Sequence, residues 1–208
     1  MAETAEHAAR IPGVHALVKW ASPAAEVQGI AAGAAVLLRD KLVTPRRLGF
    51  AVPNRTWAGQ LARACEAMGL RADIAEGEPA AERTRSVIFD FRAPASGFAW
   101  LFVVGCTEGL LPTAAALGGS NAAEGALAEQ REAFQRLLGA EDTHVVLSYF
   151  CEAEAALADQ IRLPSLHTVQ RGGIPFARLS PSRFIGEMGQ ARPTTVGGQR
   201  FLRDAGLN

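Results

Sequence analysis

The sequence predicts an α/β protein, with a mostly parallel sheet of about five strands flanked by helices. Two observations carry this prediction. Short apolar segments alternate with longer helical segments over residues 14–152, and such alternation places parallel strands beneath covering helices. The segment AWLFVVG (residues 99–105) is apolar throughout, as expected for a central parallel strand that is buried on both faces.

The first strand and helix follow from the residues that begin them. VHALVKW (residues 14–20) alternates as a strand does, and Ser22 and Pro23 then stand as N-cap and first residue of a helix. Glu26 falls in the first turns of this helix, where a carboxylate suits the helix dipole. An apolar face at helical spacing continues the helix over residues 24–42.

A second strand and helix come next. RLGFAVP (residues 47–53) is a strand that ends at a proline, and Asn54 is placed to cap the following helix. Gly69 is a suitable C-terminal cap for that helix. We expect a short strand over residues 71–74 and a polar loop over residues 76–85.

Three further strands complete the predicted sheet. SVIFDF (residues 86–91), the apolar segment already described and THVVLSYF (residues 143–150) have the apolar content of buried strands. A glycine-rich loop over residues 117–125 leads into a helix that runs from about residue 123 to residue 138.

The chain therefore divides into three parts. Residues 1–13 are expected to be a flexible lead, and residues 14–152 form the α/β domain. Residues 153–208 carry many turn residues, which predicts a loosely ordered extension. Within it, residues 165–179 are expected to be loop with a little extended structure, and a short helix is expected near residues 181–189.

Composition indicates a globular protein. The chain has 208 residues, of which 49% are hydrophobic and 20% charged, and its formal net charge is zero. These values exclude an intrinsically disordered chain and a strongly basic overall field of the kind that attracts nucleic acid. No apolar segment approaches the roughly 20 residues that cross a bilayer. With three widely spaced cysteines, a disulfide framework is not expected, and we expect a cytoplasmic protein without membrane contact.

The common nucleotide motifs are missing. A P-loop needs a lysine directly after a glycine, and the two lysines, Lys19 and Lys41, follow other residues. The glycine fingerprint of dinucleotide-binding folds is also absent. Of the 21 basic residues, the remaining 19 are arginines, whose planar guanidinium groups bind phosphate well. Base composition of the genome would explain the same excess.

Few residues are candidates for other chemistry. The histidines show no metal-binding spacing and no C-x-x-C occurs, so no metal site is expected. Cys106 follows a predicted strand and is the one plausible nucleophile, but a small apolar filler is the better interpretation. Asp90 ends a strand without a second carboxylate nearby and more plainly caps a turn.

FVVGCTEGLLP (residues 102–112) resembles a segment of the UvrD/PcrA/Rep family of superfamily 1 DNA helicases and of the related AddB-type repair proteins. In that family a strand of the second RecA-like domain leads into a G-x-x-E-G-x-x-P turn. The corresponding residues here are Gly105, Glu108, Gly109 and Pro112.

Other segments resemble the same family in the same order. Residues 21–40 look like its strand followed by an acidic helix, where Glu26 stands at the matching place. Residues 47–70 look like the strand and helix that follow, with AVPNR closest to AddB-type proteins. Residues 129–150 are similar without gaps to the segment of the last helicase motif, and residues 181–184 resemble its P-S-R-F-L box. In the third of these segments the matching residues are Glu129, Arg131 and Phe134.

The departures concern the catalytic residues. Where the family has T-x-H-x-x-K-G-L-E-F/W, this chain has FRAPASGFAW, which keeps Gly97 and Trp100 but not the histidine, lysine or glutamate. The arginine of the family's T-R-A motif, which stabilises charge during phosphoryl transfer, corresponds to Ala140. Arg136 stands one helical turn earlier and could substitute for it.

The resemblance implies a RecA-like fold of the P-loop NTPase type without the P-loop, and it implies candidate residues without a catalytic group. The nucleotide-cleft candidates are Gly97, Gly105, Glu108, Gly109, Arg131 and Arg136. The DNA-binding candidates are Arg55, Arg92 and Arg183.

These observations together predict a helicase-like module of a DNA repair or recombination protein, without ATPase activity on its own, that binds DNA or protein. Its partners would be single-stranded DNA, a P-loop helicase domain or a nuclease subunit. ATP and magnesium would be cofactors only if a P-loop domain completed the site. Two alternatives stay open: a fragment of an active ATP-dependent DNA helicase or helicase–nuclease, and a small-molecule enzyme that uses Cys106 or Glu108 at the strand ends.

Overall fold

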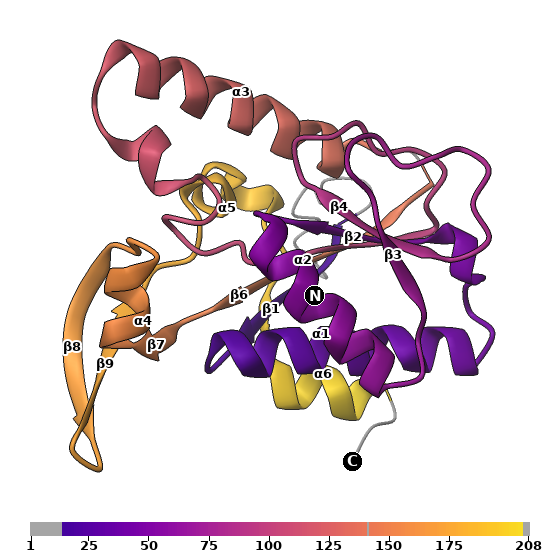
Figure 1. The fold of residues 1–208 in the computed structure, drawn as a ribbon, viewed down its shortest axis with the longest axis horizontal. Helices are drawn as coiled ribbons and strands as arrows, with labels where there is room; N and C mark the ends of the chain where they lie inside the picture. Colours follow the sequence, from indigo (N-terminus) through magenta and orange to yellow (C-terminus); the bar gives the residue numbers. More distant parts are fainter. Residues whose placement is uncertain (1–13, 141, 206–208) are drawn as a thin grey trace, which may run out of the picture.

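The protein is an α/β structure in three layers, as the sequence predicts (Figure 1). The structure is a computed structural model that describes residues 14–140 and 142–205. The expected flexible lead, residues 1–13, lies outside the described residues. A central sheet separates a layer that contains α1, α2 and α6 from a layer that contains α3 and α5.

All pairings in the central sheet are parallel, which confirms the predicted class of sheet. Among the described residues it has seven strands, in the order β10-β1-β6-β5-β2-β4-β3. The predicted strands are present within a residue or two of their expected ends, and the additional strand is β10. The strands are β1 (Val14–Trp20), β2 (Leu48–Val52), β3 (Ala72–Ile74), β4 (Ser86–Asp90), β5 (Trp100–Val103), β6 (His144–Phe150) and β10 (Thr195–Gly197).

The helices begin where the capping residues predict. Helix α1 (Pro23–Arg39) starts after Ser22, whose side chain accepts a hydrogen bond from the Ala25 backbone at 3.2 Å. Helix α2 (Arg55–Ala67) starts after Asn54, whose side chain accepts one from the Trp57 backbone at 3.1 Å. Helix α3 (Asn121–Leu138) starts two residues before its predicted position, because Ser120 caps it in the same way.

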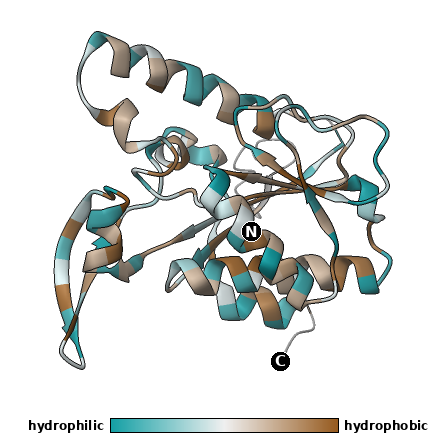
Figure 2. Cartoon of the chain, viewed as in Figure 1, coloured by the Kyte–Doolittle hydropathy of each residue, from teal (hydrophilic) through white to brown (hydrophobic). Residues whose placement is uncertain are grey.

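A hydrophobic core lies on each face of the sheet. Beneath α1 and α2, the rings of Phe50 and Phe102 stack at 5.6 Å between centroids. Beneath α3, Phe134 and Leu137 pack on Leu101 and other side chains of the opposite sheet face. Figure 2 shows the resulting pattern, with hydrophobic strands inside helices of mixed hydropathy. Burial on both faces is what the apolar central strands predict.

The C-terminal extension has more regular structure than its turn-rich sequence suggests. Strands β8 (Ser165–Arg171) and β9 (Ile174–Leu179) form an antiparallel hairpin that projects from the body, instead of the expected loop (Figure 1). Gly172 and Gly173 are its two-residue turn, both with positive φ (57° and 81°). A two-residue turn of this kind suits the twist of a hairpin and favours glycine.

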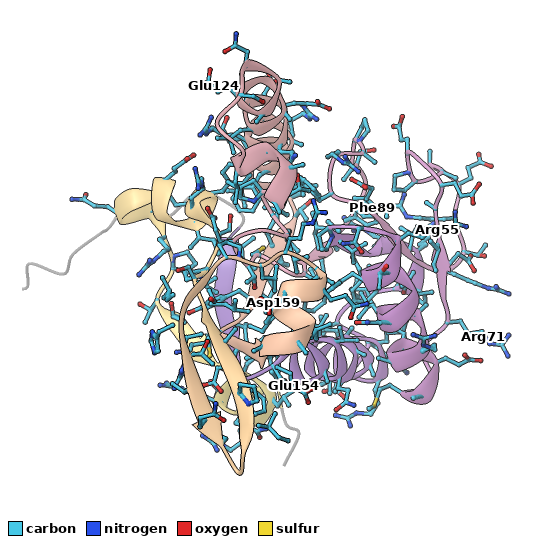
Figure 3. The ribbon with its side chains drawn as sticks, turned by 60° about the vertical axis from the view of Figure 1, so that its left-hand side comes forward. Arg55, Arg71, Phe89, Glu124, Glu154 and Asp159 are labelled. Carbon is cyan, nitrogen blue, oxygen red and sulfur yellow. The ribbon has the colours of Figure 1, made fainter. Side chains whose placement is uncertain are left out.

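A buried carboxylate, that of Glu152, links both strands of the hairpin to the segment that precedes them. Strand β7 (Glu152–Glu154) pairs with β9, and the side chain of Glu152 is 7% exposed. Arg171 and Arg178 both form ion pairs with Glu152, at 2.9 Å and 2.5 Å. These two arginines, although suitable for phosphate by type, are therefore engaged in the fold. Helix α4 (Ala155–Gln160) follows β7, and Figure 3 shows Glu154 and Asp159 beside the hairpin.

The last segment returns to the sheet. Strand β10 pairs with β1 as an edge strand, and helix α6 (Gly198–Asp204) packs on α1 and β1. Trp20 at the end of β1 lies beneath this segment, and its ring contacts that of Phe201 edge-on at 6.4 Å. None of the described helices combines the length and the apolar character needed to cross a membrane.

Candidate functional site

The turn after β5 is held by backbone hydrogen bonds to two other segments. Gly105, with φ of 75°, turns the chain away from the sheet. The Cys106 amide donates to the Ser148 carbonyl of β6 at 2.8 Å. On its other side, Cys106 accepts from the Ser182 amide at 2.8 Å, and Thr107 pairs with Pro181 as an isolated bridge. The structure thus places residues 105–109 beside residues 180–182, as the sequence alone does not show.

Three of the segments that carry the helicase resemblance meet at the short helix α5 (Arg183–Glu187). From the turn after β5, Glu108 accepts from the Arg183 backbone at 2.9 Å and from its guanidinium at 2.6 Å. From α3, Arg131 donates two hydrogen bonds to Glu187, at 2.8 Å and 3.0 Å. The rings of Phe134 and Phe184 pack with centroids 5.6 Å apart.

These contacts engage candidates from both predicted groups. Glu108 and Arg131 were expected at a nucleotide cleft and Arg183 at a DNA surface, whereas each bonds to a neighbour within the fold. Gly109, another cleft candidate, is buried with φ of 92°, and a methyl group there would lie 2.6 Å from the Pro164 side chain. The segment that matches the helicase turn is therefore a structural junction between β5, α3 and α5.

A buried carboxyl group lies next to this junction. Glu26 on α1 is fully buried, and its Oε1 accepts from the Gly105 amide at 3.0 Å and from the Ser148 hydroxyl at 2.5 Å. Burial raises its pKa to about 7, while the bonds from Ser148 and Gly105 act in the opposite direction. Among the described residues, Oε2 has no hydrogen-bond partner, although the Trp57 indole lies close enough to lower this pKa slightly. A buried carboxyl group with a raised pKa therefore links α1, β6 and the turn.

The sequence pattern contained a signal for this burial that the helix-dipole interpretation missed. Glu26 does lie in the first turn of α1, as predicted. It also stands four residues before Ile30, and Val27, Ile30 and Ala34 form the buried face of the helix. Residues four apart share one face of a helix, so the carboxylate falls on the apolar face.

Cys106 has the surroundings of a structural cysteine. Its side chain is fully buried, and the thiol lies 3.4 Å from the Val103 carbonyl. Burial, followed by the charge of Glu26, raises the pKa of the Cys106 thiol far above its usual range. A reactive thiolate needs access and a lowered pKa. The geometry favours the apolar-filler interpretation of Cys106 over the nucleophile.

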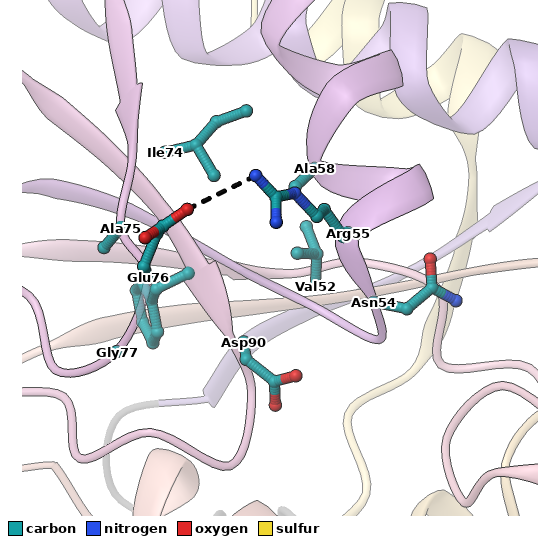
Figure 4. A pocket seen from close by; sticks show the side chains of 10 residues that line it. Val52, Asn54, Arg55, Ala58, Ile74, Ala75, Glu76, Gly77 and Asp90 are labelled. Atoms are coloured by element: carbon teal, nitrogen blue, oxygen red, sulfur yellow. Dashed lines mark hydrogen bonds and ion pairs between the residues drawn. The ribbon is translucent and has the colours of Figure 1, made fainter.

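A pocket opens at the carboxyl ends of β2, β3 and β4, where parallel sheets commonly bind ligands. It has a volume of about 460 Å³ and is lined by Asn54, Arg55, Ile74, Glu76, Gly77 and Asp90, among others (Figure 4). Arg55 and Glu76 form an exposed ion pair at 3.3 Å within it. Asp90 accepts from the Arg92 backbone and side chain, so Asp90 caps a turn as predicted.

The remaining cleft candidates lie away from this edge. Gly97 precedes β5 at the opposite, amino-terminal edge of the sheet, with φ of 72°. Arg136 lies in the last turn of α3, where it faces Glu132 at 4.0 Å. The structure therefore does not bring the six cleft candidates together in one place. Within residues 14–140 and 142–205, no group of three metal-binding side chains is found.

Gly105 is expected to be sensitive to substitution. A β-carbon at this position would lie 2.9 Å from Pro53 Cγ, and the backbone φ of 75° disfavours any side chain. Gly105→Ala should lower the free energy of unfolding by roughly 1–2 kcal/mol, measured by urea denaturation. Gly77→Ala is the control, because no described atom lies within 4 Å of its β-carbon position and its φ is not in the positive region. Equal stability of the two variants would contradict the tight packing of this turn.

No protein-family model matches the chain, and no curated protein matches it.

Proposed function

We propose that the chain is a helicase-like module without ATPase activity of its own, which acts in DNA repair or recombination by binding single-stranded DNA. The observation that carries this proposal is that Glu108, Arg131 and Arg183 form their hydrogen bonds within the fold. They stand where the resemblance predicts ligand contacts, yet they bond to one another's segments around α5. The scaffold of the motif is kept while its polar groups serve the fold.

The sequence supports the same proposal. The chain has no lysine in a P-loop context, and the position of the motif arginine holds Ala140. Loss of such an arginine costs about 10³–10⁵ in the rate of phosphoryl transfer. Arg136, the nearest substitute in sequence, has a side chain that is 54% exposed and faces a glutamate of its own helix.

A fragment of an active helicase or helicase–nuclease is the second candidate. It is favoured by the arrangement of α5, which contacts both the turn after β5 and the middle of α3. A P-loop domain on another chain would then have to supply the phosphate site and the magnesium ion. The small-molecule enzyme is less well supported, because Cys106 is buried and Glu108 is paired.

The test measures ATP hydrolysis and single-stranded DNA binding by the purified protein. We expect no ATP hydrolysis above the buffer rate, with or without a single-stranded oligonucleotide. Fluorescence anisotropy with a labelled oligothymidylate should show binding that weakens as salt increases, because counterion release dominates such contacts. DNA-stimulated hydrolysis would replace the proposal with the active fragment. Absence of binding at all salt concentrations would leave a module that binds protein.

A further inference from the structure

A basic groove lies at the amino-terminal edge of the sheet, opposite to the carboxyl-terminal edge at which parallel sheets commonly bind ligands. Its volume is about 700 Å³, and its lining includes Arg46, Arg47, Glu82, Arg83, Ser96 and Gly97. Arg46 and Arg47 form the 3-10 turn η1 (Pro45–Arg47) directly before β2. The other lining segments precede β4 and β5. Because the sheet is parallel, all of these segments lie at its amino-terminal edge.

Arg83 connects the three segments that line the groove through hydrogen bonds to their backbones. Its Nε donates to the Arg46 carbonyl at 2.6 Å, and its two terminal nitrogens donate to the Ala80 and Ser96 carbonyls at 2.9 Å and 3.0 Å. The guanidinium lies over the Phe98 ring, 4.1 Å from the centroid. One cation thus fixes the backbones of η1 and of the loops before β4 and β5.

The backbones of the two neighbouring arginines are fixed while their side chains are exposed. The Arg46 carbonyl accepts from Arg83, and the Arg47 carbonyl accepts from the Ala99 amide at 2.8 Å. Neither side chain forms an ion pair with any residue in the described part of the chain. Glu82 is the acidic residue in the lining, against three arginines, so the groove carries net positive charge.

The three arginines predicted to contact DNA differ from Arg46 and Arg47, because each of them has a carboxylate partner. Arg55 pairs with Glu76, Arg92 with Asp90 and Arg183 with Glu108. Each of those arginines is locally neutralised by a carboxylate, which reduces the attraction for a phosphate. Arg46 and Arg47 keep their full charge in a concave surface, where fields of one sign are strengthened.

We infer that the groove formed by Arg46, Arg47 and Arg83 binds the phosphodiester backbone of single-stranded DNA. The inference rests on the proposed function and gives it a location that the resemblance did not predict. Arg46 and Arg47 contact phosphate oxygens with their guanidinium groups, which suit bidentate contacts. Arg83 is a positioning residue, because its donors are engaged with backbone carbonyls.

Phosphate fits the lining better than an acidic peptide does. Apart from its charged residues, the lining consists of Ala81, Thr84, Ser96 and Gly97. Peptide sites depend on pockets for apolar anchors, and no large apolar side chain is among these described lining residues. Phosphate contacts use cations and hydroxyls, and the lining contains three arginines, a threonine and a serine.

The experiment compares two charge-reversal variants by anisotropy with a labelled 20-nucleotide oligothymidylate, a length greater than the roughly 4–16 nucleotides of a single-strand binding site. Arg46→Glu/Arg47→Glu should bind at least about tenfold more weakly than the wild type near 0.1 M salt. Its plot of log affinity against log salt should be shallower by about 1.4, the value for two phosphate contacts on a single strand. Arg55→Glu/Arg92→Glu makes the same charge change at the carboxyl edge and should bind within about twofold of the wild type.

Each other outcome overturns the inference in a recognisable way. Loss of binding in Arg55→Glu/Arg92→Glu with binding kept in Arg46→Glu/Arg47→Glu would move the site to the carboxyl edge and leave the proposed function intact. Equal losses would indicate a response to net charge alone. Displacement of the oligonucleotide by polyglutamate at equal charge concentration would assign the groove to acidic protein segments. A wild type that does not bind would overturn the proposed function as well.

Discussion

Raising the pH from about 5 to about 8 should lower the free energy of unfolding by roughly 2–3 kcal/mol through one carboxyl group, that of Glu26. Burial raises the pKa of this group from 4.5 to about 7. The cause is geometric, since the side chain is fully buried and only Oε1 has hydrogen-bond donors among the described residues.

The direction of this change in the free energy of unfolding follows from the number of protons that Glu26 binds in the folded and unfolded states. Between pH 4.5 and about 7 the folded protein keeps a proton on Glu26 that the unfolded chain has released. The folded state therefore binds more protons, and stability falls as the pH rises through this window. Below it both states are protonated, and above it both are ionised, so the contribution becomes constant.

The measurement is a series of urea denaturations across this pH range, for the wild type and for Glu26→Gln. Glutamine resembles the neutral acid in shape, so Glu26→Gln should lack this dependence. The stability difference between the two proteins should move in favour of Glu26→Gln by roughly 2–3 kcal/mol from about pH 5 to about pH 8. Glu132→Gln is the control, because the Glu132 side chain is 76% exposed. If the curves of Glu26→Gln and the wild type ran parallel, as those of the control should, the buried carboxyl would not be the source.

The features that were predictable from the sequence depend on short stretches of chain. The N-caps Ser22 and Asn54 each act on an amide three residues later. The central strands β2, β5 and β6 are recognisable because nearly every residue in them is buried. The β8–β9 hairpin was predictable in principle, since Gly172 and Gly173 separate two extended segments. The apolar pattern does not indicate it, because β8 is almost wholly exposed and β9 is only partly buried.

The candidate site was less predictable, because its side chains form hydrogen bonds with residues that are far away in the sequence. Glu108 and Arg183 are 75 residues apart, and Arg131 and Glu187 are 56 apart. No local pattern shows that these arginines are already neutralised. Arg46 and Arg47 form no ion pair within the described residues, and no local pattern shows this either. Residue type alone suits phosphate, and the fold determines which of the described arginines have a carboxylate partner.

The packing of β10 and α6 against β1 and α1 leads to a prediction at Gly29. Trp20 lies between α1 and α6, and β-carbons added at Gly29 and Gly198 would come within 2.0 Å and 2.1 Å of its ring. The ring is 4% exposed and is held from both sides. A methyl group on either helix would therefore have to move the tryptophan, which has little space on the opposite side.

Gly29→Ala should consequently destabilise the protein although alanine favours helices. The overlap with Trp20 should cost about 3 kcal/mol, from which helix propensity offsets about 1 kcal/mol. Gly59→Ala in α2 is the matched control, because no described atom lies within 4 Å of its β-carbon position. There the propensity gain acts alone, so the free energy of unfolding should rise by about 1 kcal/mol.

Thermal unfolding followed by circular dichroism separates the two cases. Gly29→Ala should lower the melting temperature by roughly 4–8 °C and Gly59→Ala should raise it by roughly 2–4 °C. Replacing Trp20 by leucine in the Gly29→Ala background should cost less than the same replacement in the wild type, because the smaller side chain relieves the overlap. Such coupling would place the effect at the contact between α1 and Trp20. If Gly29→Ala were as stable as Gly59→Ala, the packing of Trp20 beneath β10 and α6 would have to be looser than the structure has it, and the return of the chain to the sheet would contribute correspondingly less to stability.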